Sequence, residues 1–416
     1  MSAVKITGKN RLDGSVKIQG SKNAVLPVMA ASVLCRGECI IHNCPDIADV
    51  SASIRILREL GASVVFEKNT LIIDSSDIKC TRVNRELMGA LRSSVVFLGS
   101  MLSRCGCASV SMPGGCDIGK RPIDIHLASF EKMGVDVQCN VNEVFCAVNK
   151  LHSEKIILPF PSVGATENII LLAAAGKGVT TIYNAAKEPE IADLQNFLNA
   201  MGARIYGAGT STITIYSVEK LRGCEYTVMP DRIEAATYLC AAAAAGGRVV
   251  LEGMVPENIK SISSVLAGCG AKIICFDNSV YMIADDRLNC PSRINTGPYP
   301  AFPTDAQSLM MSVMSLSDGR GEIIENIFEN RFGHAEELIK MGAQICLDDN
   351  RAFVCGTQLT GADVSARDLR SGAALMVAGL GADGETVVNK IEYVFRGYDN
   401  IIKKLSLLGA DIERVE

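Results

Sequence analysis

The sequence predicts an α/β protein of two domains, each built from three copies of one repeat. Six segments end in the same pattern, an apolar helix end followed by glycine, and they recur about every 70 residues. A helix rich in small apolar residues precedes these endings, and alternating residues typical of a β-hairpin follow the first five. With 416 residues, 48% of them hydrophobic, the chain is long enough to form more than one core.

The six glycines define the repeat. They are separated by 73, 68, 68, 72 and 67 residues and are Gly61, Gly134, Gly202, Gly270, Gly342 and Gly409. A period sustained in this way identifies a repeat architecture. Each repeat reads helix–strand–helix–strand–strand, and a further strand links it to the next. Since the small-residue helices are apolar nearly all round, we expect them to be buried.

The ends of the chain belong together in this scheme. The sixth repeat finishes with GADIERVE and has no full hairpin of its own, while the N-terminal stretches VKITG and LDGSVKIQG have the alternation of strands. Those strands complete the sixth repeat if the fold closes on itself. We therefore expect one domain to hold residues 1–21 and 230–416 and the other to hold residues 22–229.

Composition excludes several classes of protein. A formal net charge of −5 argues against a dedicated nucleic-acid or membrane-surface binder, although basic residues can still converge on a small anion. The N-terminus lacks the pattern of a signal peptide, and no apolar run is long enough to span a bilayer. We expect a cytoplasmic protein whose sixteen cysteines are reduced thiols. The sequence does not indicate an oligomeric state.

One cysteine cluster resembles a metal site. Cys35, Cys39 and Cys44 lie close to His42, but their spacing matches no common zinc pattern. The whole chain has only four histidines. We therefore expect no metal there.

The second repeat contains an enlarged loop within 111–126, SMPGGCDIGKRPIDIH. From the strand end to the glycine, this repeat spans 22 positions, where the first and third span 18. The added residues present Cys116 after two glycines, with Lys120 and Arg121 close by to favour its thiolate or to hold an anion. An enlarged loop on a regular scaffold favours a functional site over a simple surface turn.

Other polar residues depart from the repeat. Lys22 and Asn23 open the first buried helix, where a lysine is unfavourable unless an anion binds there as well. Asp305 stands at the corresponding start in the fifth repeat, either as a helix cap or as a functional group. Arginines occupy equivalent loop or helix-start positions and predict a substrate with more than one anionic group. They are Arg92, Arg121, Arg331, Arg370 and Arg396. A Walker A loop and a dinucleotide fingerprint are both missing.

At these residues the chain resembles a known family over its whole length. The matching segments include GSKNAVLP, LRSS, PGGCDIGKRPIDIH, PSVGATEN, NAAKEPEI, MPDRIEA, PAFPTD, IFENRF, DLRSGAALMVAG and RGYDNI. They are similar to the UDP-N-acetylglucosamine 1-carboxyvinyltransferases of the enolpyruvyl transferase superfamily. The resemblance implies two inside-out α/β domains of three repeats each, with the active site in the cleft between them. The sister 5-enolpyruvylshikimate-3-phosphate synthases lack this cysteine loop.

The implied reaction transfers the enolpyruvyl group of phosphoenolpyruvate to the 3′-hydroxyl of UDP-N-acetylglucosamine and releases phosphate, by addition and elimination. It is the first committed step of peptidoglycan synthesis and implies no cofactor. By resemblance, Cys116 is the general acid and can form a covalent adduct, and Asp305 is the base. Lys22, Arg121 and Arg396 would hold the phosphate of phosphoenolpyruvate, and Arg331 and Arg370 its carboxylate. Asn23 would also bind phosphoenolpyruvate, and Lys22 and Arg396 would take part in catalysis.

The resemblance also implies a binding site for the UDP-sugar. Its residues would be Asn23, Arg92, Arg121, Pro122, Ile123, Asp124, Ile125, Ser162, Val163, Gly164, Asp305 and Ile327. Phe160 and Ala48 stand where some relatives have lysines, which leaves the contacts to the diphosphate open. The Cys116 loop is expected to close over the substrates. Fosfomycin should alkylate Cys116, and Cys116→Asp should resist the drug while keeping some activity.

Two alternatives remain at this point. The chain could use shikimate 3-phosphate as its acceptor, or it could be a non-catalytic paralogue that binds the UDP-sugar and regulates. The Cys116 loop argues against the first, and the complete set of catalytic residues argues against the second.

Overall fold

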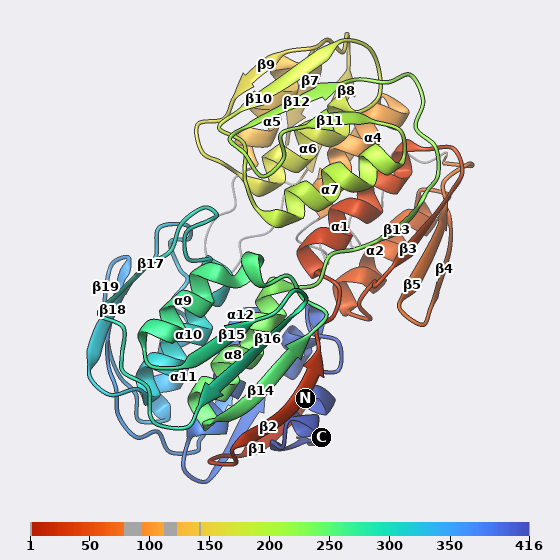
Figure 1. Cartoon of the computed structure of the whole chain (residues 1–416). Coiled ribbons are helices and arrows are strands. Elements are labelled where there is room, and N and C mark those ends of the chain that lie inside the picture. Colours follow the sequence, from red (N-terminus) through yellow and green to blue (C-terminus); the bar gives the residue numbers. More distant parts are fainter. Residues whose placement is uncertain (1, 79–93, 112–122, 141–142, 416) are drawn as a thin grey trace. The chain divides into compact units, whose positions relative to one another are not determined.

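The computed structural model describes residues 2–78, 94–111, 123–140 and 143–415, which divide into two compact units. The unit that contains both termini, here the N/C unit, comprises residues 2–19 and 230–415. The middle unit comprises the described residues between 20 and 229. Each unit has a hydrophobic core of its own, and Figure 1 traces the chain through both. Among the described residues, no helix is both long and apolar enough to cross a membrane.

The middle unit contains the first three repeats. The first consists of α1 (Lys22–Ala31), η1 (Ser32–Leu34), β3 (Glu38–His42), α2 (Ala48–Glu59), β4 (Ser63–Glu67) and β5 (Thr70–Asp74). The second consists of η2 (Ser94–Val96), α4 (Phe97–Cys105), β6 (Cys107–Ser111), α5 (Asp124–Lys132), β7 (Val135–Cys139), β8 (Glu143–Val148) and the linking strand β9 (Lys155–Ile157). The third consists of α6 (Val163–Ala173), β10 (Val179–Tyr183), α7 (Pro189–Ala200), β11 (Arg204–Tyr206), β12 (Thr212–Tyr216) and β13 (Glu225–Thr227).

The N/C unit contains the other three. The fourth repeat consists of α8 (Arg232–Ala245), β14 (Gly247–Glu252), η3 (Pro256–Ile259), α9 (Lys260–Gly268), β15 (Lys272–Cys275), β16 (Ser279–Ala284) and β17 (Arg293–Asn295). The fifth consists of α10 (Thr304–Leu316), β18 (Arg320–Ile324), α11 (Ala335–Lys340), β19 (Gln344–Asp348), β20 (Arg351–Cys355) and β21 (Asp363–Ser365). The sixth consists of α12 (Leu369–Gly381), β22 (Glu385–Asn389), η4 (Ile391–Arg396), α13 (Ile401–Leu407) and β23 (Asp411–Val415), preceded in the chain by β1 (Ala3–Thr7) and β2 (Leu12–Lys17).

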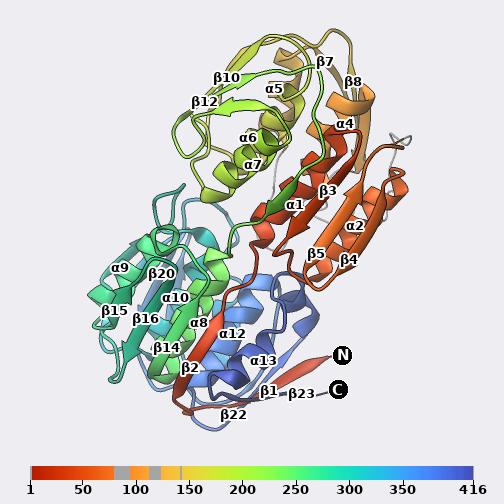
Figure 2. The ribbon, with the colours of Figure 1, turned by 45° about the vertical axis from the view of Figure 1, so that its right-hand side comes forward.

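The small-residue helices lie at the centre of each unit, with the sheets outside them (Figures 1 and 2). In the N/C unit, α8, α10 and α12 pack on one another, and in the middle unit α4 packs on both α1 and α6. Glycine makes the approach possible: a Cβ on Gly381 of α12 would lie 2.6 Å from the carbonyl oxygen of Ala244 in α8. The helices are therefore buried because their small side chains let the backbones meet, as the sequence predicts.

Strand pairing closes the N/C unit into a ring of repeats. Strand β1 lies between β22 and β23 and pairs antiparallel with both, so that Ala3 stands opposite Val415. Strand β2 runs parallel to β14 in the next sheet. The two N-terminal strands thus supply the strands that the sixth repeat lacks, and the ends of the chain lie side by side (Figure 2).

The glycine that identified the repeat has one structural role in all six copies. It follows the residue that caps the C-terminus of the amphipathic helix, and its φ is positive at each of the six positions, from 87° at Gly134 to 110° at Gly270. A side chain disfavours that conformation, whereas glycine adopts it freely. The periodic glycine is therefore the stop signal of a helix.

Candidate active site

Asp305 is the centre of the polar cluster in the N/C unit. It is the second residue of α10, and its carboxylate accepts hydrogen bonds from Arg331 Nη2 at 3.1 Å and from Arg370 Nη2 at 2.8 Å. Both arginines are 5% exposed and the Asp305 side chain is 26% exposed, so the two ion pairs are partly buried. The N-cap position of α10 is Pro303. Asp305 therefore serves as the counter-charge of two guanidinium groups.

Arg370 is fixed from several directions. Its Nη1 lies 3.4 Å from the hydroxyl of Tyr398, which in turn is 2.7 Å from Oγ1 of Thr237 on α8. Burial by itself would lower the pKa of the Arg370 guanidinium, but the charge of Asp305, followed by Tyr398 and Asp231, raises it. Arg370 is therefore a permanent cation held in place by α8, α10 and the loop after η4.

Arg331 keeps one donor available. Its guanidinium lies 5.7 Å from the ring of Phe328, and its buried Nε has no hydrogen-bond partner among the described residues. The neighbouring His334 is buried, and burial lowers its pKa to about 4, so that it is neutral at physiological pH. A buried guanidinium with an unused N–H is suited to binding an anionic oxygen.

The loop that follows Arg396 is held by Gln19. Arg396 is the half-buried last residue of η4. The amide of Gln19 donates to the carbonyl oxygen of Gly397 at 2.9 Å and accepts from the backbone N–H of Asp399 at 2.7 Å. Sequence reasoning missed Gln19, because nothing in the pattern marks a contact across 378 positions.

A buried acid anchors Gln19 in turn. Oε2 of Glu234 accepts from the backbone N–H of Gln19 at 2.7 Å, and its Oε1 pairs with Lys404 Nζ at 2.6 Å. Burial raises the pKa of Glu234 to about 7, although Lys404 opposes that shift. Ile327, which was expected at the sugar, lies half-buried after β18, and its N–H donates to Glu325 Oε1 at 2.8 Å.

In the middle unit, Lys22 is paired with an acid that the sequence did not reveal. Lys22 is the first residue of α1, and its Nζ lies 2.8 Å from Oδ2 of Asp49 in the first turn of α2. Asp49 is 3% exposed. This carboxylate supplies the negative charge that a lysine at a helix N-terminus requires. Asn23, the next residue, is half-buried.

A histidine at the start of α5 packs against the start of α6. Ser162 caps α6 by accepting from the N–H of Ala165 at 3.3 Å. Nδ1 of His126 is 3.1 Å from Nδ2 of Asn168, and a Cβ on Gly164 would lie 2.9 Å from the imidazole ring. Burial lowers the pKa of His126 to about 4, so this packing uses the neutral ring.

The other predicted residues of these two turns are all present in the structure. Ile123 is buried and directly precedes α5, and Asp124 is its exposed first residue. Ile125 and Val163 are half-buried. Of the two departures from relatives, Phe160 is 40% exposed and Ala48 is the first residue of α2. The remaining predicted site residues, including the reactive cysteine, lie outside the described residues: Arg92, Cys116, Lys120, Arg121 and Pro122.

The cysteine cluster of the first repeat divides between two environments. His42 lies on β3, where its Nε2 is 2.7 Å from Glu225 Oε1. Cys35 and Cys39 face the core with their sulfur atoms 3.6 Å apart. Among the residues that the structure describes, no three His, Cys, Asp or Glu side chains are grouped so as to hold a metal ion.

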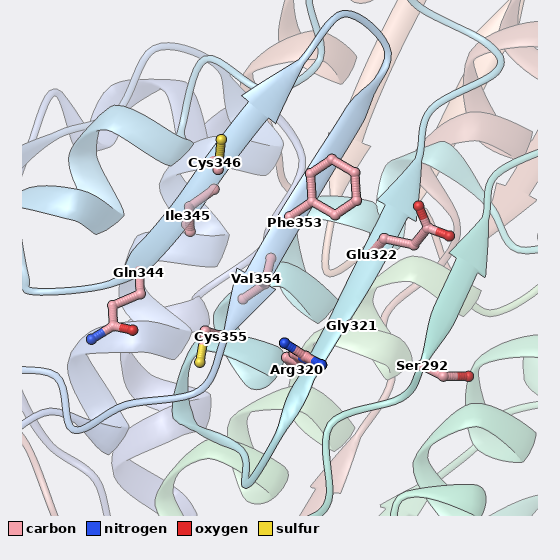
Figure 3. A pocket seen from close by; sticks show the side chains of 10 residues that line it. All are labelled: Ser292, Arg320, Gly321, Glu322, Gln344, Ile345, Cys346, Phe353, Val354 and Cys355. Atoms are coloured by element: carbon pink, nitrogen blue, oxygen red, sulfur yellow. The ribbon is translucent and has the colours of Figure 1, made fainter.

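A hollow of about 620 Å³ lies on the sheet of β17, β18, β20 and β19 (Figure 3). Its lining includes Glu322, Cys346, Phe353 and Cys355. None of the site residues predicted from the sequence lines it. It is therefore separate from the Asp305 cluster.

Comparison with known proteins identifies the family. The sequence model described as EPSP synthase (3-phosphoshikimate 1-carboxyvinyltransferase) matches residues 6–405. The chain belongs to the EPSP synthase family. The family comprises enolpyruvyl transferases, so the superfamily expected from the sequence is confirmed.

Relatives within the EPSP synthase family match the chain over its full length. UDP-N-acetylglucosamine 1-carboxyvinyltransferase 2 of Caldanaerobacter subterraneus subsp. tengcongensis is 45% identical over 416 residues, which is 100% of both chains. UDP-N-acetylglucosamine 1-carboxyvinyltransferase 1 of the same organism is 46% identical, and the match covers 97% of each chain. UDP-N-acetylglucosamine 1-carboxyvinyltransferase 1 of Halalkalibacterium halodurans is 46% identical, and the match covers 100% of this chain and 95% of that protein. Because these relatives match essentially the whole chain and are named as enzymes, this chain is an enzyme, as predicted.

Solved structures of enolpyruvyl transferases have the same fold. The enolpyruvyl transferase NikO from Streptomyces tendae superimposes with a TM-score of 0.90 at 26% identity, covering 100% of this chain and 99% of that one. EPSP synthase from Acinetobacter baumannii gives a TM-score of 0.76 at 17% identity over the full length of both chains. The predicted fold class is confirmed.

Proposed function

We propose that this enzyme transfers the enolpyruvyl group of phosphoenolpyruvate to the 3′-hydroxyl of UDP-N-acetylglucosamine and releases phosphate. The observation that carries the proposal is the identity of 45–46% to transferases of that name, over essentially the whole chain. The Asp305 cluster supports it, because it combines a base with two buried cations that suit a substrate of several negative charges.

The proposed reaction is an addition followed by an elimination. Asp305 takes the proton of the sugar hydroxyl, whose oxygen bonds to C2 of phosphoenolpyruvate while Cys116 protonates the methylene carbon C3. The resulting tetrahedral intermediate then loses a proton from C3 and phosphate from C2, which restores the double bond. General acid and base groups held at the reacting atoms supply both proton transfers.

The cations have separate proposed roles. Arg331 and Arg370 bind the carboxylate of phosphoenolpyruvate, and the unused Nε of Arg331 supports that role. Lys22, Arg121 and Arg396 hold the phosphate, and the neutral amide of Asn23 also contacts phosphoenolpyruvate. Guanidinium and ammonium groups stabilise the charge that develops as phosphate leaves. Lys22 would then exchange Asp49 for the substrate phosphate, or share its charge between them.

The UDP-sugar is proposed to bind at the first turns of α1, α5 and α6. Ser162 to Gly164 offer the N-terminus of α6, where backbone N–H groups favour an anion. The other proposed contacts are Asn23, Arg92, Arg121, Pro122, Ile123, Asp124, Ile125, Asp305 and Ile327. We propose that the enzyme acts in the cytoplasm at the first committed step of peptidoglycan synthesis, and thus in cell-wall formation, cell shape and division, and that fosfomycin targets it through Cys116.

The acceptor decides between this function and its alternatives. Purified enzyme is given phosphoenolpyruvate with either UDP-N-acetylglucosamine or shikimate 3-phosphate, and released phosphate and the enolpyruvyl product are measured. Our proposal expects turnover with the UDP-sugar and none with shikimate 3-phosphate. The family model is named for the second acceptor, and turnover with that acceptor alone would contradict us. Binding of the UDP-sugar without phosphate release would instead indicate a regulatory paralogue.

A further inference from the structure

Three thiols meet in the middle unit, at a place that the proposed reaction does not use. Cys35 and Cys39 are fully buried, with their sulfur atoms 3.6 Å apart. The thiol of Cys39 is also hydrogen-bonded to that of Cys224, which is partly exposed. Cys39 is therefore the central thiol of the three, and Cys224 is the one that solvent can reach.

The backbone holds Cys39 and Cys224 opposite each other. Strands β3 and β13 lie side by side (Figure 1). They are parallel, with Glu225 opposite Ile40, so Cys224 stands opposite Cys39. The N–H of Ile40 donates to the carbonyl oxygen of Cys224 at 2.9 Å. A Cβ on Gly223 would lie 1.8 Å from the carbonyl oxygen of Glu38, so the two segments are in close contact. Paired strands run about 4.8 Å apart, which is within the Cα separation that a disulfide accepts.

The surroundings make Cys39 the thiol that ionises first. Hydrogen bonds from Cys224 and then from Cys35 lower the pKa of Cys39 to about 4, although burial opposes that change. The same bonds raise the pKa of both partners. The guanidinium of Arg104 lies close enough to act on Cys35. Since the thiolate is the nucleophilic form of cysteine, Cys39 is suited to attack an oxidised sulfur beside it.

We propose that Cys39 and Cys224 are an oxidative modification site, at which peroxide forms a disulfide between the first and last strands of the middle unit. The sulfur of Cys224, which solvent reaches, attacks one oxygen of hydrogen peroxide, which breaks the O–O bond and gives a sulfenic acid and, with the proton of the thiol, water. The Cys39 thiolate then attacks the Cys224 sulfur, and the hydroxide that leaves takes up a proton to form the second water. Two thiols are oxidised and one peroxide is reduced to two waters.

Cys35 is the less suitable partner for Cys39. The carbonyl oxygens of Ser32 at 3.4 Å and Gly37 at 3.5 Å compete for its single S–H, and its sulfur is buried, so that an oxidant does not reach it. Cys224 has the register that the disulfide needs and the partial exposure that the first step needs.

The disulfide would close most of the middle unit into a covalent loop. Cys39 and Cys224 are 185 positions apart. A cross-link over a long loop restricts the unfolded chain and stabilises the folded one, so we expect oxidation to raise the melting temperature by about 5–10 °C.

The experiment maps disulfides in the intact, full-length enzyme. Fully reduced protein is treated with hydrogen peroxide, denatured in alkylating reagent and digested without reduction, and the peptides are identified by mass spectrometry. We expect a peptide pair linked through Cys39 and Cys224. If Cys39 and Cys224 are still alkylated when the exposed Cys346 and Cys355 are fully oxidised, the proposal is wrong.

Two variants test the choice of partner. Cys39→Ser should lose the linked peptide and leave a Cys224 sulfenic acid that dimedone traps, and its melting temperature should no longer rise on oxidation. Cys35→Ser is the matched control and should keep the Cys39–Cys224 link. A link between Cys35 and Cys39 in the wild type would overturn the assignment, and because the wild-type map shows it directly, the test does not depend on either variant folding.

Discussion

At the residue scale, Asp305 is the side chain on which the proposed chemistry depends most directly. Asp305→Asn keeps the size of the side chain but removes both the proton acceptor and the negative charge between Arg331 and Arg370. We expect kcat to fall by about 10²–10⁴-fold, measured as phosphate release at saturating substrates.

The control for Asp305→Asn is Asp277→Asn, which changes an exposed residue at the turn between β15 and β16. It should leave kcat unchanged. Because the substitution at Asp305 also leaves two buried cations without their counter-charge, circular dichroism must show that the variant is folded. A folded variant with normal turnover would remove Asp305 from the reaction.

The burial of His126 makes the free energy of unfolding depend on pH. Its pKa is about 4 in the folded enzyme because of burial, against an ordinary value of 6.5. As the pH falls from 6.5 towards 4, the unfolded chain binds a proton before the folded one does, so the free energy of unfolding decreases. We expect this residue to account for a loss of about 2 kcal/mol between pH 7 and pH 4.5.

The test for His126 is urea unfolding at both pH values in the wild type and in His126→Phe. The variant lacks the titrating ring and should lose less stability on acidification than the wild type. His152→Gln, which changes an exposed histidine, is the control and should behave like the wild type. An equal loss in His126→Phe would show that other groups cause the acid sensitivity.

At the element scale, the sequence predicted the elements of each repeat but not the contacts that hold the site together. Periodicity and glycine position depend on local backbone preferences, and these can be read from neighbouring residues. The partners of the site residues are distant in sequence: Asp49 lies 27 positions after Lys22, and Tyr398 lies 161 positions after Thr237. Pairing of that kind is decided by packing between repeats, which a single sequence does not display.

The predicted functions of the site residues depend on the resemblance more than on the pattern. From the residues alone, Asp305 was either a helix cap or a functional group, and the structure gives it two guanidinium partners. The lysine of α1 was predicted to need an anion, and Asp49 occupies that place in the structure. The predicted role of Cys116 falls outside the described residues, so it remains a prediction.

Gln19 connects β2 to the loop after η4, and replacing it tests whether this connection positions the loop. Its amide joins the end of β2 to the loop after η4, which follows Arg396. Gln19→Ala removes both hydrogen bonds and should release that loop. We expect the KM for phosphoenolpyruvate to rise about thirtyfold, because the two lost bonds contribute roughly 1 kcal/mol each. Gln195→Ala, which removes a similar bond to the backbone N–H of Ala208, should leave the KM unchanged.

An unchanged KM in Gln19→Ala would mean that η4 and its neighbours fix the Arg396 loop without Gln19. A fall in kcat and in melting temperature together, with no change in KM, would point to a general loss of stability. The two results separate a positioning role from a structural one.

At the scale of the whole molecule, the six repeats form a closed series whose starting point is arbitrary. β1 and β23 are paired neighbours, and the opposition of Ala3 and Val415 brings the two ends of the chain together. The order of strands in this sheet, β21–β22–β1–β23, matches that of a sheet built from one continuous stretch of chain, such as β17–β18–β20–β19. The fold therefore depends on the repeats being adjacent and not on where the chain begins.

A circular permutant tests that dependence. Residues 1 and 416 are joined by a short glycine–serine linker, and new ends are opened between Gly209 and Thr210, at the exposed turn between β11 and β12. Since only a surface turn is cut, we expect the permutant to fold and to retain turnover within about threefold, measured by circular dichroism and phosphate release. A second permutant opened between Ala374 and Leu375 interrupts the buried helix α12 and should not fold. If the first permutant were also unfolded, the direct link between β12 and β11 would be essential, and the closed series of repeats would not be sufficient to specify the fold.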